Sequence, residues 1–266
     1  GIEKFYTENI NKVFSHIDLA RKKGFRLINE NQLYDFYYNS APLDQKCLLI
    51  TIDDGFKNNY TIAYKEFLKK EIPALFFINS DFIGRMVYMN HNDIKDILSG
   101  GMNIGSHSSS HFNWLNLRNR NENFIAQKLD YEIIGSYVYL YRTFRTRIYS
   151  YAHPYGIYNP VIEGFTDKTY DLVYTTKRGP NLIYTNPKRL NRYVVLNYDS
   201  ISRVEEFLDY EALPIKSTSP ADGGYIGKNG MISFYFRNSF ELEKFKGFYV
   251  AVNNLKFKTK IEEDTV

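Results

Sequence analysis

The chain has 266 residues, of which 44% are hydrophobic and 24% are charged, and its formal net charge is +4 at pH 7. These values are typical of one large globular domain, with or without a small appendix, and they exclude an intrinsically disordered chain. The positive charge is spread thinly without a basic run, so we expect no nucleic-acid partner, and no apolar run is long enough to span a bilayer.

The first part of the chain predicts two helices around a short strand. Apolar residues recur at helical spacing over residues 8–23, and Gly24 follows as a stop signal. A short strand at 25–28 and a second helix near 30–38 come next. Residues 41–46 are then predicted to form a loop, because they combine Pro with polar side chains.

From residue 47 onward, short apolar runs alternate with amphipathic segments. The apolar runs predict six buried strands, at 47–52, 74–78, 102–105, 147–153, 171–176 and 192–197. The segments between them predict helices at 58–71, 92–100, 122–137 and 159–166. This alternation indicates a parallel sheet or a barrel, in which functional side chains gather at the C-terminal ends of the strands.

The last part of the chain has a different character. Residues 213–230 are rich in Pro, Gly and Ser and are predicted to be a linker or turn region. Three short strands are expected after it, at 231–236, 247–252 and 255–261. We therefore predict a main domain over 1–198, followed over 199–266 by a linker and a small β-rich C-terminal extension.

Three polar clusters follow predicted strands. Asp53 and Asp54 end the first strand of the alternating region, His107 and His111 follow the third, and the segment HPYG at 153–156 follows the fourth. Each cluster alone is a weak signal, and the two histidines could be a polar pair bonded to solvent. Their joint position matters more, because a barrel would bring all three clusters into one cleft.

One carboxylate and two imidazoles make a three-ligand metal site with open positions. Two histidines four residues apart fall on one side of a helical turn, so both can face one ion. Zn²⁺ suits these ligands and lowers the pKa of bound water to about 7, although Fe²⁺, Co²⁺ and Ni²⁺ can be held by the same set. The second carboxylate would then be free to act as a general base.

These segments resemble a known family. TIDDG at 51–55, HSSSH at 107–111 and YAHPYG at 151–156 resemble, in order and spacing, the first three signature motifs of the NodB-type polysaccharide deacetylases, carbohydrate esterase family 4. The resemblance extends over about residues 10–198. It is closest to the subgroup that contains the deacetylases of poly-N-acetylglucosamine biofilm polysaccharides.

The resemblance implies a fold, a reaction and a set of site residues. The fold would be an α/β distorted (β/α) barrel with fewer than eight full units. The reaction would be hydrolysis of the acetamide of an N-acetylated oligo- or polysaccharide, with release of acetate. Asp53 would be the general base, Asp54, His107 and His111 would bind a divalent metal, most simply Zn²⁺, and the backbone near Tyr155 would help to hold the oxyanion.

The third motif would also shape the substrate site, with Pro154 and Tyr155 in contact with the sugar. A plain tight turn is the alternative interpretation of Pro154 and Gly156. Family analogy favours the cell envelope as the location, since acetylated polymers lie there, with the cytoplasm as the alternative.

Two departures from the family pattern stand out. Ala152 occupies the position where many members carry an arginine, a change that the biofilm subgroup shares. The family also places a histidine on a late strand to protonate the leaving amine, and no histidine follows His153 in this chain. Either His153, another late residue or a water serves as the acid, or the protein only binds sugar.

Two further residues are candidates on weaker grounds. Arg192 lies near a late predicted strand, where the subgroup often has an arginine, and it could support Asp53; a surface ion pair is the alternative. Trp114, the only tryptophan, could form the floor of a sugar subsite, or it could pack in the core.

Three functions are therefore weighed. The first is a metal-dependent carbohydrate N-deacetylase. The second is a carbohydrate-binding homologue that has kept the metal site but lost turnover. The third is an O-acetyl esterase on an acetylated polysaccharide, because ester cleavage depends less on an acid for its leaving group.

Overall fold

The fold is described from a computed structural model, which is divided into two compact units, residues 1–210 and 211–266. The structure describes residues 10–43, 46–117, 119–210, 215–219, 233–236, 249–252 and 255–258.

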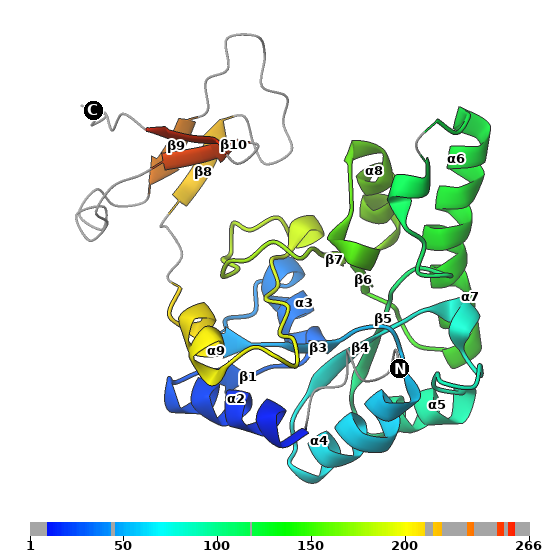
Figure 1. The fold of residues 1–266 in the computed structure, drawn as a ribbon, viewed down its shortest axis with the longest axis horizontal. Helices are drawn as coiled ribbons and strands as arrows, with labels where there is room; N and C mark the ends of the chain where they lie inside the picture. The colour runs from blue at the N-terminus through cyan, green and yellow to red at the C-terminus, as the bar shows by residue number, and fades with distance from the viewer. Residues whose placement is uncertain are drawn as a thin grey trace. The chain divides into compact units, whose positions relative to one another are not determined.

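A curved parallel sheet forms the centre of the first unit (Figure 1). Its five strands follow the order of the chain: β3 (Ile50–Ile52), β4 (Ala74–Ile78), β5 (Asn103–Ser106), β6 (Ser150–Ala152) and β7 (Leu172–Tyr174). Every residue of β4, β6 and β7 is buried, as expected for parallel strands that are covered on both faces. The predicted class is confirmed: the unit is a distorted barrel that does not close.

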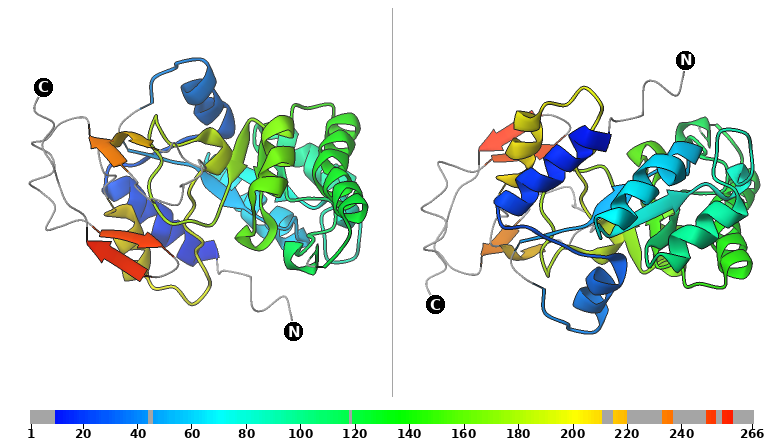
Figure 2. Two further views of the ribbon diagram at one scale, coloured as in Figure 1. Left: turned by 90° about the horizontal axis from the view of Figure 1, so that it is seen from above. Right: turned by 90° about the horizontal axis from the view of Figure 1, so that it is seen from below.

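Helices connect successive strands and lie around the sheet (Figures 1 and 2). The α-helices of the first unit are α2 (Ile10–Lys22), α3 (Glu30–Tyr38), α4 (Lys65–Lys69), α5 (His91–Ser99), α6 (Glu122–Leu129), α7 (Ser136–Phe144), α8 (Pro160–Thr169) and α9 (Ile201–Leu208). Several begin at a side chain that accepts a backbone N–H, as Asn29, Asn90 and Asn159 do at α3, α5 and α8.

Two of the predicted helices contain a π-helical turn. The segment predicted at 58–71 begins with the π-turn η1 (Asn59–Tyr64) before α4. The segment predicted at 122–137 runs on to Phe144, because α6 continues through the π-turn η4 (Asp130–Gly135) into α7. Helical periodicity did not distinguish these turns, since a single π-turn interrupts only one turn of a helix that continues beyond it.

The strand predicted at 47–52 is divided in the structure. β2 (Cys47–Leu48) pairs in parallel with β1 (Arg26–Leu27) as a separate two-stranded sheet, whereas β3 pairs with β4. The prediction of one strand was wrong because continuous apolar character reports burial and does not report which neighbour a backbone pairs with.

The prediction of a strand at 192–197 is also wrong, since these residues form no strand. The ring of Tyr193 stacks instead on that of Phe207 in α9, with 4.6 Å between ring centroids. α9 itself lies beside α2 (Figure 2). Lys23, which follows α2, forms an ion pair with Asp209 at 2.6 Å. The segment after residue 198 therefore starts with a helix that belongs to the first unit.

The second unit contains two antiparallel pairs among its described residues. β8 (Ile215–Ser219) pairs with β9 (Ser233–Phe236), and β10 (Tyr249–Val252) pairs with β11 (Leu255–Lys258). Part of the predicted linker, at 215–219, is thus a strand, and the rest of that linker lies outside the described residues. The predicted division into 1–198 and 199–266 stays a prediction.

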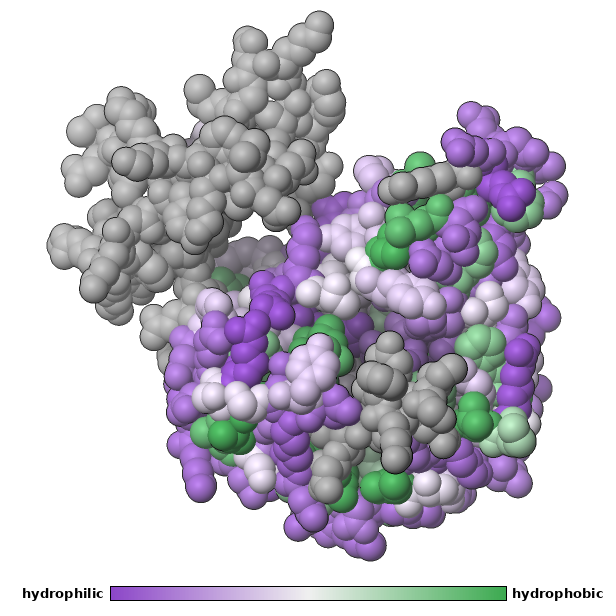
Figure 3. All heavy atoms as spheres, in the orientation of Figure 1, coloured by the Kyte–Doolittle hydropathy of each residue, from purple (hydrophilic) through white to green (hydrophobic). Residues whose placement is uncertain are grey.

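Among the helices of the described part of the chain, none combines the length and the apolar character that a bilayer crossing requires. The face shown in Figure 3 is mainly hydrophilic where it is coloured, and its hydrophobic residues form small separate patches. Patches of this kind are ordinary for a protein surface.

Candidate metal centre

Asp54 lies in a tight turn directly after β3. Both Asp54 and Gly55 have positive φ values, 74° and 71°, which is uncommon for a residue with a side chain. The turn is held by neighbouring segments: the Met89 N–H donates to the Gly55 carbonyl at 2.9 Å, and the Asn59 amide donates to the Asp53 carbonyl at 3.0 Å. These contacts fix the direction in which the two carboxylates leave the backbone.

The two histidines come from the loop after β5. His107 continues the line of the strand, since its N–H donates to the Ile78 carbonyl at 2.9 Å, and its Nδ1 lies 2.8 Å from the Ala152 carbonyl. The segment from His107 to His111 is not the helical turn that the spacing predicted. Ser108 and His111 have positive φ values of 65° and 53°, and this irregular loop brings the second imidazole back beside the first.

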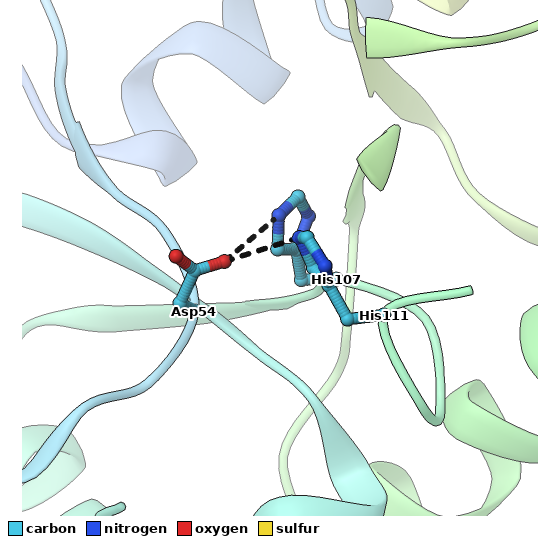
Figure 4. Close-up of side chains that lie close together, drawn as sticks. All are labelled: Asp54, His107 and His111. Carbon is cyan, nitrogen blue, oxygen red and sulfur yellow. Dashed lines mark ion pairs between the residues drawn. The ribbon is translucent and has the colours of Figure 1, made fainter. Parts of the chain in front are cut away.

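Asp54, His107 and His111 meet at one point (Figure 4). The Asp54 Oδ1 atom lies 3.4 Å from His107 Nε2 and 3.3 Å from His111 Nε2, and the three ligand atoms all lie within 4.8 Å of one another. Two ligands bonded to the same tetrahedral Zn²⁺ at 2.0–2.1 Å lie about 3.3 Å apart. The residues therefore fit a shared cation, and the sequence-based ligand set is brought together in space.

Opposite charges in this cluster stabilise one another. Burial alone raises the pKa of Asp54, but hydrogen bonds from His107 and His111 lower it well below its ordinary value. Burial lowers the pKa of His107, whereas Asp54 and Asp53 raise it, and the net shift is upward. The Nδ1 contact with Ala152 favours a proton on that nitrogen, so Nε2 is the nitrogen that faces Asp54.

Asp53 points to a different partner, Arg192. The Arg192 guanidinium binds both Asp53 carboxylate oxygens, with distances of 2.7 and 3.0 Å, and its Nε donates to the Thr175 carbonyl at 3.1 Å. Burial raises the pKa of Asp53, but the positive charges of Arg192 and His107 outweigh this effect and lower it. The surface ion pair considered as an alternative for Arg192 does not apply, since only 9% of the Arg192 side chain is exposed.

The third sequence motif forms a short 3₁₀ turn, η5 (Pro154–Gly156), beside the histidines. The backbone of Tyr155 is in the left-handed region, with a φ of 58°. Its side chain is 59% exposed, and its ring centroid lies 4.5 Å from that of His111. Gly156 has a φ of 65°, and a Cβ atom there would lie 2.0 Å from Thr176 Oγ1, so only glycine fits. Pro154 is buried, which argues against a contact with the sugar, whereas Tyr155 is open to solvent.

His153 does not reach the open side of the cluster. It is 1% exposed, and its ring stacks on that of Tyr158, with 5.1 Å between centroids. Burial, with the charges of His107 and Arg192, lowers the pKa of His153 to about 3. A buried imidazole that stays neutral at pH 7 is a poor proton donor to a substrate, so this placement argues against His153 as the general acid.

Trp114 lies in the hydrophobic core and not on the cleft. It is 4% exposed and packs edge-on against Phe112, with ring centroids 5.4 Å apart. A sugar can stack only on an exposed ring face, so Trp114 cannot form the floor of a subsite in this structure. Core packing, the alternative interpretation, is what the structure shows.

One residue near the metal loop escaped the sequence analysis. Glu132, on η4, is completely buried and accepts hydrogen bonds from Ser110, which lies inside the HSSSH motif. The sequence does contain a pattern that could have identified Glu132: it lies at helical spacing on the same face as Leu129, Ile133 and Ser136, which are buried. A carboxylate on a buried helix face usually has a specific hydrogen-bond or ion-pair partner.

Comparisons with known proteins point to one family. The family model described as polysaccharide deacetylase matches residues 40–171. YxkH of Bacillus subtilis (strain 168), which is named for the polysaccharide deacetylases, is 24% identical over 166 residues, or 62% of this chain. The chain spans 57% of the length of that curated relative.

Solved structures show the same fold. The deacetylase PplD of Streptococcus pyogenes, solved in complex with acetate, superposes with a TM-score of 0.66 at 19% identity, over 77% of this chain and 88% of PplD. IcaB from Ammonifex degensii superposes with a TM-score of 0.62 at 22% identity, over 73% of this chain and 86% of IcaB.

Proposed function

Because the chain carries a polysaccharide deacetylase domain over residues 40–171, we propose that the protein is a metal-dependent carbohydrate N-deacetylase that hydrolyses the acetamide of an N-acetylglucosamine-type glycan. The observation that carries this proposal is the convergence of Asp54, His107 and His111, with a fourth group, Asp53, beside them. The motif resemblance to the poly-N-acetylglucosamine subgroup supports the choice of an amide substrate.

Each side chain has a distinct task in the proposed reaction. Asp54, His107 and His111 would hold a divalent cation, for which Zn²⁺ is the first choice and Co²⁺, Ni²⁺ and Fe²⁺ are alternatives. When bound, such a cation polarises a carbonyl group and makes water a better nucleophile at neutral pH. Asp53 is held ionised by Arg192, so it is ready to take the proton of the attacking water.

The surroundings of the cluster favour substrate access from one side. About a third of the side-chain surface of Asp53 and of Asp54 is exposed, while His107 and Arg192 lie behind them. Tyr155 lies beside His111 with its ring open to solvent, so a sugar ring can stack on it. We expect the backbone near Tyr155, in η5, to help stabilise the oxyanion.

The test measures acetate release and metal binding on the same protein. Zn²⁺-loaded protein is expected to release acetate from N-acetylglucosamine oligomers, and removal of the metal by a chelator is expected to abolish the release. The Asp53→Asn variant should lose on the order of 10²–10⁴-fold in rate. It should still bind Zn²⁺, because Asp54, His107 and His111 are unchanged. Metal-bound wild-type protein that releases no acetate from any N-acetylated sugar would contradict the proposal.

The absence of an evident general acid supports a second candidate, an O-acetyl esterase. No histidine follows His153 in the chain, and His153 itself is buried and neutral. The leaving group of an ester is an alkoxide, which depends less on protonation than the amine that leaves from an amide. Ester hydrolysis therefore tolerates a missing general acid better than amide hydrolysis does. Acetylated xylan and N-acetylglucosamine oligomers offered in competition would separate the two activities. Binding of both without release of acetate would indicate a carbohydrate-binding homologue.

A further inference from the structure

A buried ion pair lies behind the loop that carries the two histidines. Glu132 is 0% exposed and receives two hydrogen bonds from Ser110: its Oε2 accepts from the backbone N–H at 2.8 Å, and its Oε1 accepts from the hydroxyl. The Lys128 ammonium, one helical turn earlier, lies 2.6 Å from Oε1 and balances the charge. The carboxylate thus holds both the backbone and the side chain of one loop residue.

The backbone of the same helical segment holds the next residue of the loop. η4 is a π-helical turn, and two of its carbonyl groups point at Ser109: the Tyr131 carbonyl accepts from the Ser109 hydroxyl at 2.8 Å, and the Glu132 carbonyl accepts from the Ser109 N–H at 3.1 Å. Single π-turns inside α-helices are frequent at functional sites, where they redirect backbone groups. Here the redirected groups meet the middle of the HSSSH segment.

The loop needs such support, because its conformation is unfavourable by itself. Ser108 and His111 both have positive φ values, which are costly for residues other than glycine and persist only where surrounding contacts fix them. Ser109 and Ser110, which lie between these two residues, are the ones bound by η4. The loop is thus held from two sides, by η4 and by the segment after β4, where the Ser80 and Asp81 N–H groups donate to the Ser108 and Ser109 carbonyls.

A purely structural role would not require a charge at this position. The Lys128–Glu132 ion pair contributes little net stability compared with apolar residues of the same size, because the buried carboxylate loses its hydration. Leu129 and Ile133, the neighbours of Glu132 on the buried helix face, are apolar. The carboxylate differs from them in one respect: it can accept two directed hydrogen bonds from the loop.

We propose that Glu132 is a positioning residue for the metal site, which fixes His107 and His111 at the separation a cation requires by holding Ser110. This inference rests on the proposed function, because it assigns Glu132 a part in metal binding. It predicts that metal affinity depends on a side chain that does not itself reach the ligand atoms. Groups that orient metal ligands in this way typically change affinity by about 10–100-fold when they are removed.

The experiment compares Zn²⁺ dissociation constants of metal-free protein and its variants, measured by calorimetric titration against a competing chelator. Ser110→Ala and Glu132→Ala are each expected to weaken Zn²⁺ binding by about 10–100-fold. Glu132→Gln keeps the shape and one acceptor, so it should recover part of the loss. The double variant Ser110→Ala/Glu132→Ala should bind no more weakly than Glu132→Ala alone, because the two residues act through the same contact.

A matched control separates positioning from general destabilisation. Glu163, also nearly buried, pairs with Arg189 away from the metal loop, so Glu163→Gln should lower stability without changing the Zn²⁺ dissociation constant. Hydrogen exchange of the metal-free protein gives a second readout: Glu132→Ala should speed exchange at residues 107–111, and Glu163→Gln should not. If Glu132→Ala does not fold, Ser110→Ala and Glu132→Gln carry the same comparison.

The outcomes distinguish this inference from the proposed function. Wild-type Zn²⁺ affinity in both Ser110→Ala and Glu132→Gln, with unchanged exchange in the loop, overturns the role of Glu132 and leaves the proposed function intact. Tight binding by the wild type without acetate release contradicts the proposed function, while the affinities still decide the role of Glu132. A wild-type protein that binds none of Zn²⁺, Co²⁺, Ni²⁺ and Fe²⁺ overturns both.

Discussion

At the scale of single residues, the adjacent carboxylates Asp53 and Asp54 have different surroundings. Asp54 faces His107 and His111 at 3.4 and 3.3 Å, whereas Asp53 is bound in two places by Arg192. Each negative charge has its own partner, which offsets the repulsion expected between two neighbouring acids. One carboxylate is therefore suited to hold a cation and the other to accept a proton.

Arg192 provides a prediction at this scale. In Arg192→Lys the planar two-point contact with Asp53 is lost, and the ammonium forms at most a single contact. We expect deacetylation to slow by about 10-fold or more while the Zn²⁺ dissociation constant is unchanged. The Arg192 charge lowers the pKa of Asp53, so weakening the contact should move the acidic limb of the kcat/KM profile to higher pH.

Arg189→Lys is the control for this prediction, since Arg189 pairs with Glu163 away from the metal ligands. It should leave both the rate and the pH profile unchanged. An Arg192→Lys variant with a wild-type pH profile would show that Arg192 does not set the protonation of Asp53.

At the scale of elements, α3 is joined to the sheet through a buried acid. Glu30, the first residue of α3, is 1% exposed and accepts a hydrogen bond from the Ser150 hydroxyl on β6. Burial raises the pKa of Glu30 to about 8, despite the opposing hydrogen bond from Ser150. The folded protein therefore keeps a proton on Glu30 at neutral pH, which the unfolded chain would release.

This proton makes stability depend on pH. Since the pKa of Glu30 is higher in the folded state, its contribution to stability is full below about pH 4.5 and decreases as the pH rises to about 8. The loss amounts to about 1.4 kcal/mol for each unit between the two pKa values. Urea unfolding measured between pH 5 and pH 8 should show this decrease, and Glu30→Gln, which cannot ionise, should show a smaller one. Identical pH dependence in the two proteins would rule out the effect.

At the scale of the whole molecule, the candidate metal site lies within one of the two units. The sheet, the helices α2–α9 and all the residues discussed above fall within residues 1–210. The second unit contributes its two described hairpins, β8–β9 and β10–β11. Metal binding is therefore expected to be a property of the first unit.

A chain that ends at Tyr210 tests this expectation. At a Zn²⁺ concentration about 100 times the dissociation constant, binding should stabilise the folded state by about 2.7 kcal/mol and raise the Tm by roughly 5–10 °C. The shift should be the same in the full chain and in residues 1–210, and His111→Ala should remove it from both. A shift confined to the full chain would show that residues 211–266 take part in the site.

The sequence by itself determined the fold class, the main helices and strands, and the chemical types present at the strand ends. Periodicity reports burial, and burial fixes most elements, so α2, β4 and α5 were predicted nearly to their ends. The order of DD, HxxxH and HPYG along the chain placed all three clusters at one edge of a parallel sheet. That edge is where the structure brings Asp54, His107 and His111 together.

Only the tertiary structure decided what depends on contacts between distant segments. The apolar run at 47–52 is divided between two sheets, and the predicted strand at 192–197 is absent, with Tyr193 packed against α9 instead. Trp114 and His153 are buried. The tertiary structure also paired Arg192 with Asp53 and Glu132 with Ser110. A local pattern shows that a side chain is apolar or charged, but its partner is chosen by the packing of the whole chain, which no single segment encodes.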